Sequence, residues 1–212
     1  MRNFWDTIVS RQDMIQNAFL EHIYLSFVAV AIGIAIALPT GIIIARYRRY
    51  AEPVIGVTAI FQTIPSLALF GFLVPILGIG STTALIALII YALLPILRNT
   101  YTGITGVDGS VIEAGRGMGM TRTQILRQIE LPLALPFIMA GIRTATVLTV
   151  GIATLATFVG AGGLGDIIYR GLQSYNNSLV LVGALPVALL AIGFDLILKW
   201  IEKRATPRGL KN

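Results

Sequence analysis

Residues 53–97 of this chain contain no Asp, Glu, Lys, Arg or His. These 45 residues are about twice the roughly 20 that a helix needs to cross a hydrocarbon layer roughly 30 Å thick. The whole chain is 56% hydrophobic and only 12% charged, far from the averages of soluble domains. The sequence therefore predicts an all-α membrane protein whose chain crosses the bilayer more than once.

Charged residues and turn signals divide the apolar sequence into five predicted membrane-spanning helices. A turn at residues 78–81 separates the second helix from the third inside the charge-free stretch. The five predicted spans cover residues 21–45, 54–77, 82–97, 133–159 and 179–200. We expect a polytopic helix bundle that forms a single transmembrane domain over residues 1–212.

The basic residues predict the orientation of this bundle, because loops rich in Lys and Arg are retained on the cytoplasmic side. Of the 16 basic residues, one side of the predicted spans holds Arg46, Arg48, Arg49, Arg98, Arg116, Arg122, Arg127, Lys199, Lys203, Arg204, Arg208 and Lys211. The other side holds Arg2, Arg11 and Arg170, and Arg143 falls inside a span. We therefore expect the N-terminus outside and the C-terminus in the cytoplasm.

Three patterns bear on packing. Small residues recur at every fourth position of the first span and would let another helix approach closely; they are Ala29, Gly33, Ala37, Gly41 and Ala45. A proline lies in or beside every span, which permits bends but also occurs in static bundles: Pro39, Pro65, Pro75, Pro95, Pro136 and Pro186. The apolar residues of segment 1–20 predict an amphipathic helix in the outer headgroup region.

Residues 108–131, termed here the polar loop, form the longest polar stretch of the chain. Two capping-box patterns, Ser110-x-x-Glu113 and Thr121-x-x-Gln124, each predict the start of a short helix. The glycine-containing segment 117–120 predicts the break between the two helices. Such a helix-turn-helix is typical either of a docking element or of a loop that rests on the membrane surface.

The second short helix has one apolar face, because Ile125, Leu126 and Ile129 recur at helical spacing while Arg122, Arg127 and Gln128 face elsewhere. Pro132 predicts the start of the next span.

The sequence EAGRGMGMTRTQILRQIELP, residues 113–132, resembles the signature loop of the integral membrane permeases of ATP-binding-cassette (ABC) importers. The matching residues are Glu113, Ala114, Gly119, Ile129, Leu131 and Pro132, and Gly115 stands where the family has alanine. Segments 62–80, 91–104 and 151–172 resemble the osmoprotectant subfamily, whose members import glycine betaine, choline, carnitine or proline. The permeases of methionine importers have a similar length and share the GAGGLG turn, so they are the alternative.

This resemblance implies a type I ABC importer permease fold, with five transmembrane helices and a cytoplasmic coupling helix in the polar loop, in a bacterial plasma membrane. It implies that Glu113, Ala114, Gly115, Gly119, Ile129, Leu131 and Pro132 couple the chain to an ATPase. The implied partners are a cytoplasmic ATPase dimer, an identical or homologous second permease and an external substrate-binding protein, with no nucleic acid. The chain itself would bind no cofactor, since ATP would be used by the partner ATPase.

The GAGGLG sequence at residues 160–165 spells G-x-G-x-x-G, but here it follows a membrane span rather than a strand. We therefore expect a flexible external turn that contacts a binding protein, not a dinucleotide site. His22 is the only histidine and no cysteine is present, so a His/Cys metal site cannot be assembled. We expect His22 to be an interface residue.

Two charges, Arg143 and Asp195, fall within predicted spans, where ionised groups are costly and often functional. Lys199 lies four residues after Asp195, so an ion pair within one helix is the simpler explanation for the acid. Arg143 has three possible roles: at a subunit interface, along a water-filled path, or with its guanidinium reaching back to the membrane surface. An intramembrane enzyme and a non-transporting scaffold are the alternatives to a transport subunit, and co-purification of an ATPase would separate them.

Overall fold

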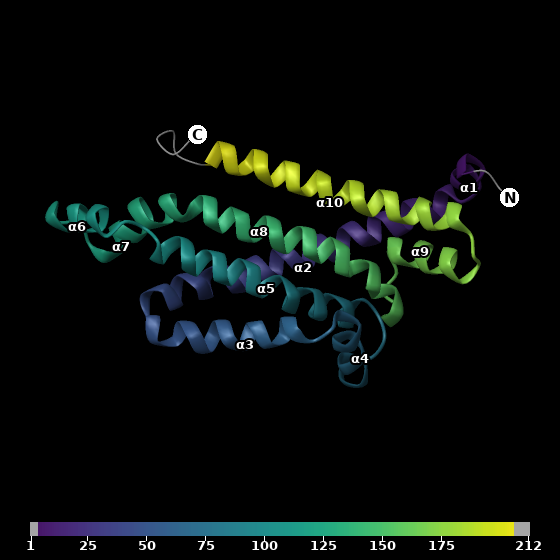
Figure 1. Ribbon diagram of the computed structural model, residues 1–212, viewed down its shortest axis with the longest axis horizontal. Coiled ribbons are helices and arrows are strands. Elements are labelled where there is room, and N and C mark those ends of the chain that lie inside the picture. The colour runs from purple at the N-terminus through teal and green to yellow at the C-terminus, as the bar shows by residue number, and fades with distance from the viewer. Residues whose placement is uncertain (1–3, 206–212) are drawn as a thin grey trace.

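The computed structural model describes residues 4–205 as a long bundle of roughly aligned helices (Figure 1). Over that part of the chain the regular secondary structure is entirely helical, which confirms the all-α prediction. Four helical stretches are long and apolar enough to cross a membrane, namely Gln12–Arg46, Ser81–Thr105, Arg122–Val159 and Asn177–Ala205. A fifth span results if the bent pair Arg48–Thr63 and Ser66–Leu77 is counted as one crossing.

In chain order the elements are α1 (Phe4–Ser10), α2 (Gln12–Arg46), η1 (Arg48–Tyr50), α3 (Ala51–Thr63), α4 (Ser66–Leu77), α5 (Ser81–Thr105), α6 (Gly109–Gly117), α7 (Arg122–Ile125), the π-helical turn η2 (Leu126–Glu130), α8 (Leu131–Ala153), η3 (Thr154–Val159), α9 (Leu164–Gln173) and α10 (Asn177–Ala205). The long helices α2, α5 and α8 pack side by side as the centre of the bundle, and α10 flanks α8 (Figure 1).

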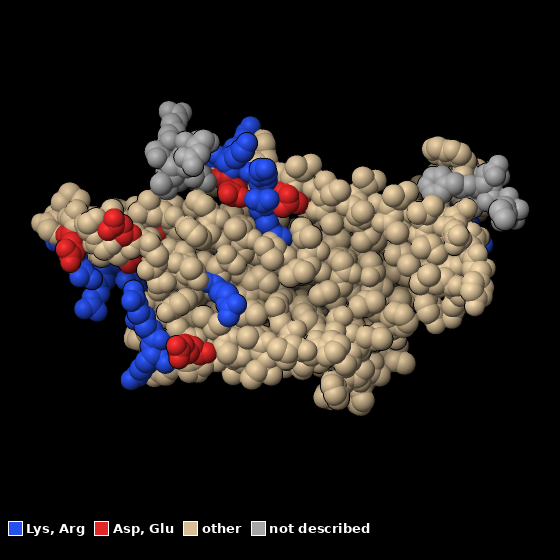
Figure 2. Space-filling model, in the orientation of Figure 1, with Lys and Arg blue, Asp and Glu red and all other residues tan. Residues whose placement is uncertain are grey.

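The two ends of the bundle differ in charge. Helices α6 and α7 lie at the same end as the last turns of α10, whereas α1 and α9 lie at the opposite end (Figure 1). On the face shown in Figure 2, the charged side chains gather in the half that includes α6, and the rest is nearly free of them. This asymmetry agrees with the uneven distribution of basic residues along the sequence. Arg2, Arg208 and Lys211, which entered that prediction, lie outside the described residues.

The predicted ridge of small residues is confirmed as the contact surface between α2 and α5. All five members of the ridge, from Ala29 to Ala45, are buried. A Cβ atom added at Gly33 would lie 3.0 Å from the Cβ of Ala92, and one added at Gly41 would lie 2.7 Å from the Cβ of Thr100. The two backbones therefore approach so closely that only small side chains fit between them.

The second predicted span is not one straight helix. Its halves, α3 and α4, are bent by 98° at a break that holds Ile64 and Pro65. Ile64 has an extended backbone (φ −71°, ψ 127°) because the proline ring that follows disfavours the helical conformation. The side chain of Tyr91 donates a hydrogen bond to the carbonyl of Ile64, so the break is anchored to α5.

The N-terminal segment differs from the prediction in one respect, because it is not a single separate helix. Residues 12–20 belong to the long helix α2, so only α1 is a separate helix. The side chains of Ile8, Met14, Ile15 and Phe19 pack against a buried cluster that includes Leu164 and Leu179 of α9 and α10. These side chains are partly buried while Trp5 and Val9 stay exposed, and the location of the segment in the outer headgroup region stays a prediction.

Candidate functional site

The polar loop begins with α6, but not at the predicted cap. Asp108 precedes the helix, and its carboxylate accepts a hydrogen bond of 2.8 Å from the backbone N–H of Ser110. This hydrogen bond lowers the pKa of the Asp108 carboxyl below its usual value. The predicted capping box of Ser110 and Glu113 is therefore wrong, because the acid two residues earlier already holds the helix start.

The turn between α6 and α7 is formed as predicted. Gly119 has φ +79°, a conformation that favours glycine, and the N–H of Met120 donates to the carbonyl of Gly115 at 3.1 Å. The capping box of Thr121 and Gln124 is confirmed, with reciprocal hydrogen bonds of 3.3 and 2.7 Å. These contacts define the angle at which the two short helices meet.

Gly115, the residue that departs from the family pattern, lies on the inner side of the polar loop. Gly115 is buried, and a Cβ added there would lie 2.8 Å from Cδ1 of Ile129 and 3.3 Å from Sδ of Met120. Ile125, 3% exposed, lies beneath the same contact. The apolar face predicted for the second helix thus packs against α6, and glycine lets the two helices approach closely.

The candidate coupling residues divide into an outward and an inward group. Glu113, Ala114 and Gly119 are exposed on the outer surface of the loop, while Gly115 and Ile129 contact each other inside it. The exposed surface also carries Met118, which is 75% exposed. Leu131 and Pro132 lie apart from both groups, half-buried in the first turn of α8. The loop therefore presents a small, partly apolar surface on a rigid base.

No break separates the polar loop from the next span. Helices α7 and α8 are joined by η2, and together with η3 they form one helical stretch, Arg122–Val159. Pro132 lies in the first turn of α8, as expected, but it has no N–H to donate to the preceding turn. The π-helical turn just before it places the N–H of Leu131 on the carbonyl of Leu126. Movement of the second short helix would therefore pass directly into α8.

An ion pair that was not predicted from the sequence lies at the base of the loop. Arg46, the last residue of α2, donates to both carboxylate oxygens of Glu130, at 2.7 and 3.3 Å. The side chain of Glu130 is only 6% exposed. Each residue was part of a segment already singled out, but the sequence carries no signal that pairs them across 84 positions.

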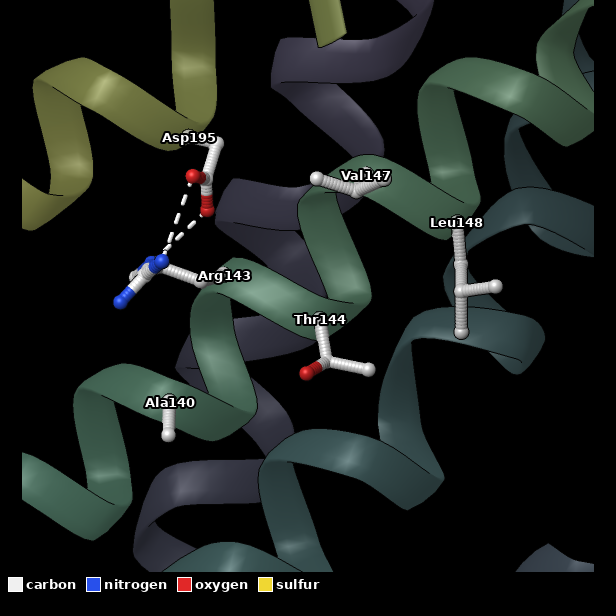
Figure 3. Close-up of a pocket in the computed structure, with 6 residues that line it drawn as sticks. All are labelled: Ala140, Arg143, Thr144, Val147, Leu148 and Asp195. Carbon is white, nitrogen blue, oxygen red and sulfur yellow. Dashed lines mark hydrogen bonds and ion pairs between the residues drawn. The ribbon is translucent and has the colours of Figure 1, made fainter. Parts of the chain in front are cut away.

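Arg143 lies in α8 and pairs with two acids of α10. Its Nε and one terminal nitrogen contact the two oxygens of Asp195 at 2.8 and 3.2 Å (Figure 3). Its other terminal nitrogen lies 3.2 Å from the carboxylate of Glu202. The predicted pairing of Asp195 with Lys199 is thus wrong, because Arg143 offers two parallel hydrogen bonds that Lys199 cannot. The seven-residue spacing of Asp195 and Glu202, which places them on one helix face, was the signal available.

A cavity of about 420 Å³ opens beside this ion pair. It is lined by Ala140, Arg143, Thr144, Val147, Leu148 and Asp195, which Figure 3 shows along one face of α8 and on α10. The α8 side chains of this face other than Arg143 are exposed in the single chain. This exposure leaves room for a further helix, lipid or solute, and the ion pair forms the polar edge of the space.

The GAGGLG turn is packed rather than flexible. Gly160, Gly162 and Gly163 have positive φ, and the N–H of Gly163 donates to the carboxylate of Glu21 at 2.9 Å. A Cβ added at Gly162 would lie 2.3 Å from that carboxylate. The glycines therefore let the turn fold against α2, which argues against the predicted flexibility, while its external position and its contact with a binding protein stay predictions.

His22 follows Glu21 and is fully buried within the chain, with Nε2 3.0 Å from the carbonyl of Val150. The prediction of an interface role is therefore wrong for the single chain, since the residue joins α2 to α8 from inside. Among residues 4–205, no group of three or more His, Cys, Asp or Glu side chains could hold a metal ion.

Comparisons with known proteins agree on one kind of molecule. Residues 37–207 match the family described as the binding-protein-dependent transport system inner membrane component. The glycine betaine/carnitine/choline transport system permease protein OpuCB of Bacillus subtilis (strain 168) is 50% identical over 191 residues, which cover 90% of this chain and 88% of that protein. The carnitine transport permease protein OpuCB of Listeria monocytogenes is also 50% identical, with the same coverage.

The fold has a counterpart among solved structures. An inward-facing structure of the MetNI methionine ABC transporter contains a chain that superimposes with a TM-score of 0.83 and 27% sequence identity. The match covers 93% of this chain and 99% of that one. The arrangement of helices described above is therefore that of an ABC importer permease.

Proposed function

The chain belongs to the family of binding-protein-dependent transport system inner membrane components, and from this premise we propose that it imports osmoprotectants such as glycine betaine, carnitine or choline. It is a permease subunit of an ATP-driven ABC importer, an integral membrane protein and not an enzyme. One observation carries the substrate proposal: about nine-tenths of the chain is 50% identical to permeases named for these solutes.

The methionine alternative has less support. The match to the methionine transporter has 27% sequence identity, against 50% for the osmoprotectant permeases. A shared fold serves many solutes, so the more similar sequences carry more weight for substrate class.

The proposed assembly contains two copies of the permease, or this chain with a homologous one, above a cytoplasmic ATPase dimer and below an external binding protein. Membership in a binding-protein-dependent transport family supports each of these partners. The exposed outer surface of the polar loop, with Glu113, Ala114 and Met118, supports docking of the ATPase there. The chain binds no cofactor in this proposal, and ATP is used by the ATPase.

The proposed orientation places the polar loop and the end of α10 in the cytoplasm and α1 outside. The concentration of basic residues around the polar loop and its end of the bundle supports this orientation. Closure of the ATPases on ATP would then move the polar loop, and the permease pair would alternate between inward and outward openings. The solute would cross without any chemical change.

Uptake measurements test the proposal directly. The permease is co-expressed with its ATPase and binding protein in cells lacking other osmolyte importers, and uptake of labelled glycine betaine, choline, carnitine and methionine is measured at high salt. We expect uptake of at least one quaternary ammonium solute and none of methionine. Methionine uptake without uptake of the other three would overturn the substrate proposal.

A further inference from the structure

The ion pair between Arg46 and Glu130 links two segments that the chain does not connect directly. Arg46 ends α2, and Glu130 ends the π-helical turn η2 between the polar loop and α8. Two guanidinium nitrogens reach both carboxylate oxygens, and one of them also donates to the carbonyl of Arg122 at 3.4 Å. Such a two-point, charge-assisted contact holds both distance and direction; the Glu130 side chain is 6% exposed and that of Arg46 is 35% exposed.

The surroundings of this pair are not tightly packed. A cavity of about 230 Å³ lies between the end of α2 and the polar loop, lined by Arg46, Ile112, Arg116, Arg122, Ile125 and Glu130. The ion pair lies in the wall of this cavity. Because the space between the two segments is incompletely filled, the ion pair carries a larger share of their connection than it would in a close-packed contact.

The three central helices are connected differently to the polar loop. Helix α8 continues from the loop through η2 without a break, so movement of the loop reaches it along the backbone. Helix α2 has no such covalent route, since residues 47–108 intervene along the chain. It packs closely on α5 through Gly33 and Gly41, so whatever moves α2 also moves α5.

We propose that Arg46 and Glu130 are positioning residues for transport: their ion pair ties α2 to the polar loop, so that α2, α5 and α8 follow the loop as one body. The proposal rests on the proposed docking of the ATPase to this loop. Without the pair, the end of α2 would follow the loop only indirectly, through its packing on α5 and α8, and ATP hydrolysis would continue with less solute transported.

The first test measures solute imported per ATP hydrolysed by the complete importer, reconstituted in liposomes with saturating binding protein. Arg46→Ala and Glu130→Gln should each lower the ratio of solute imported to ATP hydrolysed roughly 5- to 100-fold, a change of the size that typical coupling free energies produce. The ATPase should still co-purify with both variants. Arg48→Ala is the matched control, because Arg48 is exposed two residues away and should leave the ratio unchanged. An unchanged ratio in both pair variants would overturn the proposal.

A second test replaces the ion pair by a covalent link. The chain has no cysteine, so Arg46→Cys and Glu130→Cys can be combined without removing other thiols. The double variant should be uncoupled while its thiols are free, and a bifunctional reagent that joins the two positions should restore the ratio. If joining the two positions instead abolished transport, α2 and the polar loop would have to separate during the transport cycle. The proposed role of the ion pair would then be wrong.

The readouts keep this proposal distinct from the proposed function. A wild-type complex that neither retains an ATPase nor imports any of the tested solutes would overturn the proposed function. A wild-type complex that imports normally, with pair variants equally well coupled, would overturn only the tether. Variants that lose coupling but keep ATPase binding and membrane insertion separate a positioning role from a general loss of structure.

Discussion

Arg143 on α8 and Asp195 on α10 form a two-point ion pair within the membrane-spanning bundle. The pair matters for α10 because, among that helix's described residues, the buried ones are Leu179, Val182 and Gly183, all near its start. The later turns of α10 have only half-buried apolar contacts, such as Leu198 against the central cluster, and Arg143 adds a directional contact to them. Glu202 adds a second contact about two turns further along the same face of α10.

Removing Arg143 should loosen α10. Arg143→Ala removes the guanidinium that contacts Asp195 and Glu202, and we expect a loss of about 1–3 kcal/mol, below the usual cost of breaking a buried pair because the three side chains are 23–34% exposed. Thermal unfolding in detergent measures the effect. Asp195→Asn combined with Arg143→Ala should cost less than the sum of the two single changes. Lys199→Ala is the control, and an equal loss there would contradict the assignment.

A larger residue at Gly41 should separate α2 from α5. A Cβ there would lie 2.7 Å from Thr100 and 3.2 Å from the carbonyl of Leu97, so Gly41→Val must move the backbone and should cost about 1–3 kcal/mol or more. Gly193→Ala is the matched control, because nothing lies within 4 Å of a Cβ at that helical position. The thermal stability of each variant is measured in detergent. Equal stability of the two variants would show that α2 and α5 do not pack as described.

The GAGGLG turn should resist substitution for two separable reasons. Gly78→Ala is the comparison: Gly78 lies outside this turn, at the end of α4, and has φ +81° with nothing within 4 Å of an added Cβ, so its replacement should cost only backbone strain of about 1–3 kcal/mol. Gly162→Ala, at φ +78°, adds a collision with the carboxylate of Glu21 and should cost more. Adding Glu21→Ala to Gly162→Ala should recover part of the difference. The same thermal assay compares the variants, and no recovery would mean that Glu21 does not pack on the turn.

The outer surface of the polar loop should be needed for docking but not for insertion. Glu113→Lys reverses an exposed charge, and Gly119→Val forces a branched side chain into a backbone with φ +79°. Both should abolish ATPase co-purification and uptake while the chain remains in the membrane fraction. Gly56→Ala is the control, because Gly56 lies in α3 outside the loop and a Cβ there meets nothing within 4 Å. Whole-cell uptake at the wild-type rate in both variants would show that the loop is not the docking element.

Composition and periodicity determined much of this protein. The charge-free stretch, the basic loops and the four-residue recurrence of small side chains are local properties, so the presence of several spans, the polar loop and the contact face of α2 could be predicted from them. The capping box at Thr121 and the positive φ at Gly119 were predictable for the same reason, since each depends on residues only a few positions apart.

Only the tertiary structure decided which distant groups meet. Arg143 pairs across 52 positions, Arg46 across 84, and Glu21 reaches Gly163 across 142. A charge in a span needs a partner, but its sequence neighbours do not name that partner, and Asp195 proved to contact Arg143 rather than the nearer Lys199. The packing of α2, α8 and α10 determines the partner. A hydrogen bond or ion pair is strongest where neighbouring helices bury its two groups and also fix their relative direction.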